Sequence, residues 1–306
     1  MSLADTERWV RPFGRGESDG FAVAIQPDES AWRHTGLLVA HLDAGGTRSL
    51  DTGDREFIVV PLSGAVRVDV RDAAGEEHGV DLPGRVSVFT GPTDVAYVPK
   101  DASLTLSGPG GARVALAFAV ANKQADPLPF KHIPADDVPV ELRGAGQCSR
   151  EVRNFGTPDV LEADSIIACE VLTPAGNWSS YPPHKHDEER PGEETELEEI
   201  YYFEIRPTPD APEGADAVGY QRVYGAGDRP IDVLAEVRTG DVVLVPHGWH
   251  GPAMAPPGYD LYYLNVMAGP GPERKWLICD DPAHGWVRGQ WADQQVDPRL
   301  PFGGEQ

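Results

Sequence analysis

The segment FIVVPLSGAVRVDV, residues 57–70, contains the pattern from which the fold is predicted. It opens with a continuous apolar run from Phe57 to Leu62, and the turn pair Ser63-Gly64 follows. From Ala65 to Val70 apolar and polar residues then alternate, which is the period of a half-buried β-strand. The segment therefore predicts two strands joined by a tight turn.

Similar short apolar runs, separated by turn residues, recur along the chain. Glycine and proline are frequent, with 34 and 29 residues among 306, as in β-rich proteins with many turns. No long amphipathic helical pattern interrupts the runs, so a βαβ fold is not expected. The sequence predicts an all-β protein, with further strands over residues 85–89, 95–99, 102–106, 112–118, 165–171, 199–204, 221–224, 241–246 and 262–266.

The pattern of the first half returns in the second half. Residues 57–70 correspond to 199–224, and the later Val98-Pro99 corresponds to Val245-Pro246. A proline-rich stretch between the halves has the composition of a linker. We therefore predict a bicupin-like architecture of two tandem β-sandwich or jelly-roll barrels. Its predicted parts are a barrel over 1–125, a linker over 126–145 and a second barrel over 146–306.

Charge and composition exclude several classes of function. The net charge is −23 and the pI is about 4.6, so neither nucleic acid nor an anionic membrane surface is an expected partner. No apolar run approaches the roughly 20 residues of a membrane helix, and residues 1–11 lack the apolar core of a secretory signal. The three cysteines, Cys148, Cys169 and Cys279, have no metal-binding or redox spacing. These features predict a cytoplasmic protein.

The candidate site begins with a His-Lys-His triplet. In an extended chain residues i and i+2 point to the same side, so His184 and His186 are predicted to reach one ion together. Glu199 opens the next strand, and His250 follows a Val-Pro strand end. Two rivals remain: Glu198 for Glu199, disfavoured because Glu199 shares a strand face with the aromatic residues 201 and 203, and His247 for His250.

Three imidazoles and one carboxylate suit a divalent ion such as Zn, Mn, Fe, Co or Ni. Such a set leaves one or two coordination positions for water or substrate, which Lewis-acid chemistry requires. The acidic stretch 187–198 is predicted to be a long exposed loop between the ligands. The first half contains only scattered histidines, His34, His41 and His78, so its barrel is predicted to lack a metal site.

Longer strings carry a family resemblance. The stretches NWSSYPPHKHD (177–187), LEEIYYF (197–203), VPHGWHG (245–251) and DDPAH (280–284) resemble the 5-deoxy-glucuronate isomerases of myo-inositol catabolism, within the cupin superfamily. More distantly, they are similar to the 5-keto-4-deoxyuronate isomerases of pectin breakdown. The resemblance covers the second half in detail and the first half only in general rhythm. Here the spacing from the triplet to Glu199 is longer than in most cupins, a feature that this family shares.

The resemblance implies an aldose–ketose isomerase that converts 5-deoxy-D-glucuronate to 5-dehydro-2-deoxy-D-gluconate through an enediol. Such a reaction requires a Lewis acid, a proton-transferring group and a cationic anchor for the substrate carboxylate. The predicted proton-transferring groups are Glu199, Tyr201 and Tyr263. The predicted substrate-binding residues are Lys185, Arg222, Trp249 and Arg274, with Arg288 and His284 as further candidates in the closing segment.

Two other functions share these features. A cupin dioxygenase uses the same three-histidine, one-glutamate set to hold iron, and a non-catalytic sugar-binding bicupin shares the fold. Neither a helix-turn-helix signal nor a basic surface points to a regulator of transcription. The expected partner is a small sugar acid, and exposed β-edges predict a homo-oligomer.

Overall fold

The fold is that of a computed structural model, which describes residues 3–14, 18, 20–28 and 31–303. Strands dominate it, as the all-β prediction requires. Its α-helix, α1 (Leu3–Trp9), has seven residues. Among the described residues no helix combines the length and the apolar character needed to cross a membrane. The 3-10 helices are η1 (Val88–Thr90), η2 (Ala135–Asp137), η3 (Gly146–Cys148) and η4 (Gly285–Asp293).

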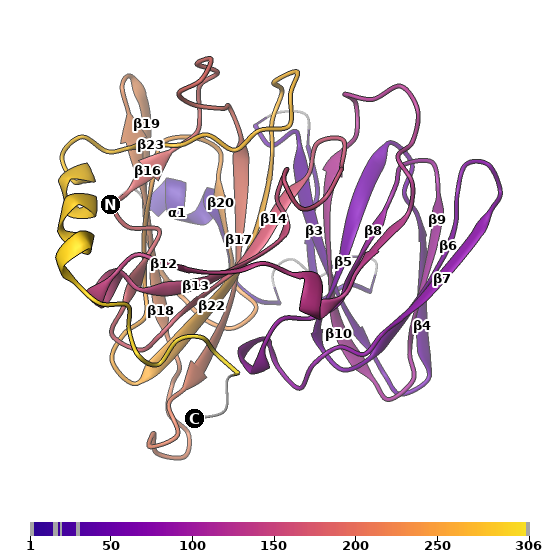
Figure 1. The fold of residues 1–306 in the computed structure, drawn as a ribbon, viewed down its shortest axis with the longest axis horizontal. Coiled ribbons are helices and arrows are strands. Elements are labelled where there is room, and N and C mark those ends of the chain that lie inside the picture. The colour runs from indigo at the N-terminus through magenta and orange to yellow at the C-terminus, as the bar shows by residue number, and fades with distance from the viewer. Residues whose placement is uncertain (1–2, 15–17, 19, 29–30, 304–306) are drawn as a thin grey trace.

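The first half is a sandwich of two antiparallel sheets, drawn in indigo to magenta in Figure 1. The inner, six-stranded sheet has, in order, β11 (Lys131–Ile133), β8 (Val95–Val98), β5 (Arg55–Ser63), β10 (Ala112–Val120), β3 (Thr35–Leu42) and β2 (Val23–Ile25). The outer, four-stranded sheet has β4 (Gly46–Asp51), β9 (Ser103–Gly108), β6 (Val66–Arg71) and β7 (Glu77–Leu82).

The second half is a larger sandwich of the same kind. Its seven-stranded sheet has β1 (Val10–Arg11), β20 (Val242–Val245), β17 (Glu198–Pro207), β22 (Tyr259–Ala268), β14 (Ile167–Thr173), β13 (Arg150–Gly156) and β12 (Val140–Arg143). Its six-stranded sheet has β19 (Arg229–Val237), β18 (Gly219–Ala226), β21 (Trp249–Met254), β16 (His184–Lys185) and β23 (Cys279–Asp280), with β15 (Trp178–Ser179) also paired to β21.

The contrast within residues 57–70 follows from which faces of each strand are buried. In β5, Phe57 and Val59 face the core of the first sandwich, whereas Ile58 and Val60 face the core that is continuous with the second half. Both faces of β5 are therefore covered, which is why its sequence is continuously apolar. Strand β6 belongs to the outer sheet and has one solvent face, so its residues alternate between buried and exposed.

The segments at the predicted domain edges take part in the sheets. The first strand, β1, pairs with β20, and α1 packs against β19, so the start of the chain belongs structurally to the second sandwich. Within 126–145, β11 extends the sheet of the first half and β12 extends that of the second half. The division at 125 and 146 stays a prediction, and these pairings show how closely the halves are interlocked (Figure 1).

One predicted strand is wrong. Residues 85–89 form a loop that ends in η1, where the Ser87 side chain accepts a hydrogen bond from the Phe89 amide. Val86 is 86% exposed, whereas the Arg85 guanidinium is buried against Glu170 of the second half. The loop conformation lets Arg85 reach across the interface, an interaction between distant residues that the local pattern does not contain.

Candidate metal and substrate site

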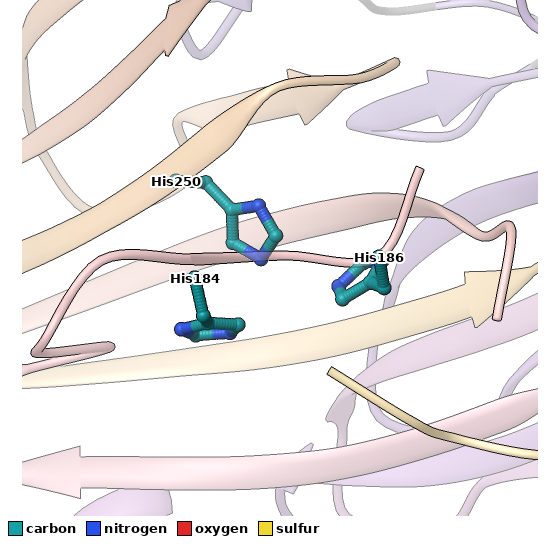
Figure 2. A group of neighbouring side chains, drawn as sticks. All are labelled: His184, His186 and His250. Carbon is teal, nitrogen blue, oxygen red and sulfur yellow. The ribbon is translucent and has the colours of Figure 1, made fainter. Parts of the chain in front are cut away.

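Three histidines converge inside the second sandwich. His184 and His250 are directly paired neighbours on β16 and β21, and His186 follows β16 two residues later. The ring centroids of His184 and His186 lie 4.4 and 4.6 Å from that of His250. Figure 2 shows the rings gathered together, two from one segment and the third from the neighbouring strand. Their nearest nitrogens all lie within 4.8 Å of one another.

Backbone carbonyls fix the orientation of each ring. The Nδ1 atoms of His184, His186 and His250 lie 3.4, 3.1 and 3.2 Å from the carbonyl oxygens of Pro182, Leu197 and Gly248, respectively. With its proton on Nδ1, each ring donates a hydrogen bond to its carbonyl oxygen, and the lone pair on Nε2 stays free. This is the arrangement by which proteins orient histidine ligands of a metal.

The two rival carboxylates point in opposite directions. Oε2 of Glu199 lies 3.1 Å from Nε2 of both His186 and His250. The neighbouring Glu198 instead accepts hydrogen bonds from the backbone amides of Arg33, His34 and Thr35 in the first half. Strand alternation thus brings Glu199 to the histidines and directs Glu198 into the interface.

The electrostatics of the cluster keep His184 neutral and Glu199 ionised. Burial, together with the nearby His250 and His186, holds the pKa of His184 well below its usual value. Burial raises the pKa of Glu199, but His186 and His250 outweigh it and lower the pKa to about 2. Burial lowers the pKa of His186, whereas its hydrogen bond with Glu199 raises it, with a net upward shift. Glu199 is therefore ionised at neutral pH.

These residues fit a divalent metal ion. When two ligand bonds of about 2.1 Å meet at one ion, the ligand atoms lie about 3.0 to 3.4 Å apart, as Glu199 does from both His186 and His250. His250 Nε2 is also buried and, although Glu199 Oε2 lies 3.1 Å away, makes no hydrogen bond among the described residues, so its lone pair is available to a cation. The rival His247 is not part of the cluster.

The acidic stretch 187–198 is only partly an exposed loop. Glu194 is completely buried, and Asp187 is 5% exposed. Lys185 Nζ lies 2.7 Å from Asp187 Oδ1 and 2.8 Å from Glu194 Oε1, on the side of the strand away from the histidines. Asp187 also accepts a 2.7 Å hydrogen bond from the amide of Gly248 and so holds the turn before His250. Lys185 therefore anchors this loop beneath the site.

A small pocket opens beside the cluster. It receives His184 and Glu199 from the cluster and the predicted Tyr201 and Tyr263 from strands β17 and β22. The remaining lining residues are Arg143, Arg150, Val152, Val171, Ser180, Asn265 and Trp276. Glu199 is the one carboxylate among these lining residues, and Arg143 and Arg150 are the two cations among them.

The two tyrosines meet at one serine. The hydroxyl groups of Tyr201 and Tyr263 each lie 3.1 Å from Ser180 Oγ, and all three side chains are buried. Burial raises the pKa of Tyr263 to about 12 and that of Tyr201 well above its usual value. Both phenols therefore keep their protons at neutral pH. Ser180 adopts a φ of 47°, uncommon for a residue other than glycine.

The other predicted substrate-binding residues lie outside the pocket lining. Arg222 is paired with Asp232, 2.5 Å away. Trp249 stacks on the ammonium of Lys185, 5.7 Å from its ring centre. Arg274 donates hydrogen bonds of 2.6 to 2.7 Å to the carbonyl oxygens of Ile166, Leu161 and Gly156. His284 lies near the Tyr181 ring, with centroids 6.3 Å apart.

The structure brings in residues that sequence reasoning missed. Arg143 and Arg150 come from β12 and β13, within or next to the predicted linker, and Ser180 and Asn265 complete the polar lining. The strand-like run of residues 150–153, Arg-Glu-Val-Arg, was the available signal, because buried charges in a strand point to an interior polar site.

The fold and the cluster define the class of protein: a two-sandwich cupin with a three-histidine, one-glutamate candidate metal centre in its second half. The sequence model of the KduI/IolB family matches residues 9–287. The chain belongs to this family, and the predicted resemblance is confirmed.

Named relatives cover nearly the whole chain. A 5-deoxy-glucuronate isomerase of Geobacillus kaustophilus is 39% identical over 281 residues, 92% of this chain and 95% of the relative. One of Bacillus subtilis is 40% identical over 250 residues, 81% of this chain and 86% of the relative.

Solved structures show the same fold. The crystal structure of an IolB-like protein from Salmonella typhimurium has a TM-score of 0.79 at 34% identity and covers 91% of this chain and 98% of its own. An oxalate decarboxylase of Lactobacillus farciminis, at 12% identity, has a TM-score of 0.62 and covers 89% of this chain and 88% of its own. The predicted bicupin fold is confirmed, with sheets that pack as sandwiches and do not close into barrels.

Proposed function

We propose that this chain is an aldose–ketose isomerase that converts 5-deoxy-D-glucuronate to 5-dehydro-2-deoxy-D-gluconate. The observation that carries the proposal is the likeness to named 5-deoxy-glucuronate isomerases over 92% of the chain. The pocket supports it, because its lining combines His184 and Glu199 of the cluster with two tyrosines and two arginines. Inositol catabolism is the corresponding metabolic context, and we expect a cytoplasmic homo-oligomer.

We assign His184, His186, Glu199 and His250 as the ligands of a divalent ion, chosen from Zn, Mn, Fe, Co and Ni. When bound, the ion would polarise the carbonyl and hydroxyl oxygens of the substrate. The low pKa of Glu199 supports a ligand role, because a carboxylate with a pKa of about 2 is a poor proton acceptor at neutral pH. Glu199 thus holds a fixed negative charge beside the imidazoles.

The protein's own proton donors toward the substrate oxygens are then Tyr201 and Tyr263. An enediol reaction moves one proton between neighbouring carbons and another between their oxygens. Both phenols are protonated at neutral pH and share Ser180 as a hydrogen-bond partner, so one can donate a proton to a substrate oxygen and regain one from the other through the serine hydroxyl. Because they are protonated, neither phenol takes up the proton that leaves carbon. Their burial excludes bulk water from this exchange.

The test is conversion of 5-deoxy-D-glucuronate to a ketose by the purified protein, before and after chelation and metal return. His184→Ala is assayed alongside, with bound metal measured in both proteins. We expect conversion that requires metal and is lost in the variant. Bound metal without ketose formation would overturn the isomerase proposal, and oxygen consumption with an aromatic or thiol substrate would then favour the dioxygenase alternative.

A further inference from the structure

Arg150 is a buried cation that lacks a matching anion. Its side chain lies at the start of β13, lines the pocket beside the histidines and is 5% exposed. Among the described residues no carboxylate lies within ion-pair distance of it, and its hydrogen bond, 3.0 Å long, goes to the carbonyl oxygen of Cys148. A guanidinium carries five N–H donors, so most of its donor capacity is unused.

The neighbouring arginines are saturated in comparison. Arg143 lines the same pocket but is bound through two nitrogens to Glu141, at 2.9 and 2.7 Å. Arg288 is similarly paired with Asp280. Arg274, the other arginine whose pKa burial lowers to about 10, is satisfied by three backbone carbonyls. Arg150 alone in this comparison combines deep burial, a place in the pocket and free donors.

The guanidinium is also held in place. The Trp291 ring of η4 packs against it, 5.4 Å from centroid to Cζ, and the Cys148 carbonyl fixes one nitrogen. Burial lowers its pKa to about 10, which still leaves it fully charged at neutral pH. A fixed, desolvated arginine is the usual protein partner of a planar carboxylate, because two parallel N–H groups match two oxygens.

We propose that Arg150 binds the carboxylate of the acyclic sugar-acid substrate, while the reacting end of the same molecule lies at the histidine cluster. This inference rests on the proposed isomerase function and names the residue that selects acids over neutral sugars. Arg150 is a binding residue that orients the chain of the substrate in the pocket. Its binding energy, remote from the reacting carbons, contributes to their alignment.

The experiment compares Arg150→Gln, Arg150→Lys and Arg143→Gln in the metal-loaded protein. KM and kcat are measured with 5-deoxy-D-glucuronate, and binding of D-glucuronate and of neutral D-glucose is measured by calorimetry. We expect Arg150→Gln to raise KM by about 100-fold and to abolish the preference for D-glucuronate over D-glucose. Arg150→Lys retains part of the preference, since it keeps the charge but not the paired donors.

The matched control is Arg143→Gln, which removes an equal charge from the same pocket but one already neutralised by Glu141. It should raise KM by less than about 10-fold. Equal effects of the two Gln variants, or a KM for Arg150→Gln within about threefold of wild type, would overturn the proposal. If the wild-type protein binds D-glucuronate through Arg150 yet converts no 5-deoxy-D-glucuronate, the isomerase function fails while acid binding by Arg150 stands.

Discussion

The two halves place different residues at the same position of the same strand. Phe57 of β5 pairs with Val98, just before Pro99, and Glu199 of β17 pairs with Val245, just before Pro246. Phe57 thus occupies in the first sandwich the place that Glu199 occupies in the second.

The ring of Phe57 packs against the tilted ring of Phe118, with centroids 5.0 Å apart, and a Cβ atom at Gly36 would lie 1.9 Å from the Phe118 ring. The first lumen is therefore filled by aromatic side chains where the second holds a carboxylate and imidazoles. At this strand position, a phenylalanine accompanies a packed apolar core in the first sandwich, and a glutamate accompanies a polar cluster in the second.

The residues just before Phe57 and Glu199 are both glutamates, and both bind backbone amides of the other half. Glu56 accepts hydrogen bonds from the amides of Asp164, Ser165 and Ile166 of the second half. Glu198 accepts them from three successive amides, residues 33–35, of the first half. Each sandwich thus anchors a loop of the other through an equivalent glutamate. The shared anchor serves the fold, and the neighbouring position is free to diverge in function.

The largest expected effect concerns the histidine cluster of the second sandwich, which the first sandwich lacks among its described residues. His250→Ala removes one imidazole of the cluster, and we expect kcat/KM for 5-deoxy-D-glucuronate to fall by about 1,000-fold or more. The reason is that a bound metal supplies several kcal/mol of transition-state stabilisation, and each 1.36 kcal/mol corresponds to about a factor of ten. Bound metal per chain, measured by elemental analysis, should fall in parallel. His78→Ala in the first half is the matched control and should leave both quantities unchanged.

His78 is a suitable control because it belongs to a separate group of polar side chains in the first half, away from the histidine cluster. It lies on β7 near Asp72 and Glu76 of the preceding turn, and its Nε2 is 2.8 Å from Asp72 Oδ2. Asp72 Oδ1 already accepts the amides of Ala74 and Glu76. If His78→Ala lowered metal content as much as His250→Ala, the assignment of the ion to the second sandwich would be wrong.

The next prediction concerns the buried ion cluster between the halves. Glu170 of β14 binds Arg85 of the first half, and Tyr262 donates to it at 2.7 Å. Glu170→Gln should lower the free energy of unfolding at pH 7 by about 4 kcal/mol, because Arg85 then remains buried without its anion. Glu236→Gln, which breaks an exposed pair with Arg238, is the control and should cost less than about 1 kcal/mol.

The same pair gives a pH dependence. Burial raises the pKa of Glu170, but Arg85 outweighs it and holds the pKa below its usual value of 4.5. A carboxyl whose pKa is lower in the folded state stabilises the protein above its unfolded pKa and loses that contribution as the pH falls through its folded pKa. The unfolding free energies of wild type and Glu170→Gln, measured in urea, should therefore begin to converge as the pH falls below about 4.5. A constant difference down to pH 2 would contradict the pairing.

How much of this was predictable from sequence differs between fold and site. The apolar runs predicted most strands correctly, because residues such as Ile58 and Val60 report burial directly. The loop at 85–89 was missed because Arg85 is held by a residue of the other half. His184 and His186 could be placed together from strand periodicity, and the cluster with His250 is what the cupin strings imply. Their role as metal ligands stays a prediction.

The proposed substrate anchor, Arg150, was beyond sequence reasoning. Lys185 and Arg222 looked suitable by position, but each is neutralised by carboxylates that only the folded chain brings near, Asp187 and Asp232 respectively. Arg150 stands out because it has no such partner among the described residues, and this absence becomes visible only when every neighbour is placed. Whether a charged side chain is already paired depends on the tertiary structure, whereas the periodicity of a strand can be read from the local sequence.

A cavity in the packed core of the first half should lower the free energy of unfolding by about 3 kcal/mol. Phe57→Ala removes a completely buried ring, and the cavity left beside Phe118 should lower the free energy of unfolding by about that amount. Metal content should stay at the wild-type value. Thermal unfolding followed by circular dichroism measures the first quantity, and elemental analysis measures the second. Loss of metal on Phe57→Ala would show that the two sandwiches are not independent in function.

The smallest effect tests the shared anchor. Glu56→Gln and Glu198→Gln each replace an acceptor of three amides with a group that also donates, so each should lower the free energy of unfolding by about 2 kcal/mol. The glutamates contact different loops, 164–166 and 33–35, so their effects should add to about 4 kcal/mol in the double variant. Calorimetric unfolding of the four proteins measures this. A double variant no less stable than either single one would mean that the two anchors act as one unit, and the equivalence of the halves at this position would be lost.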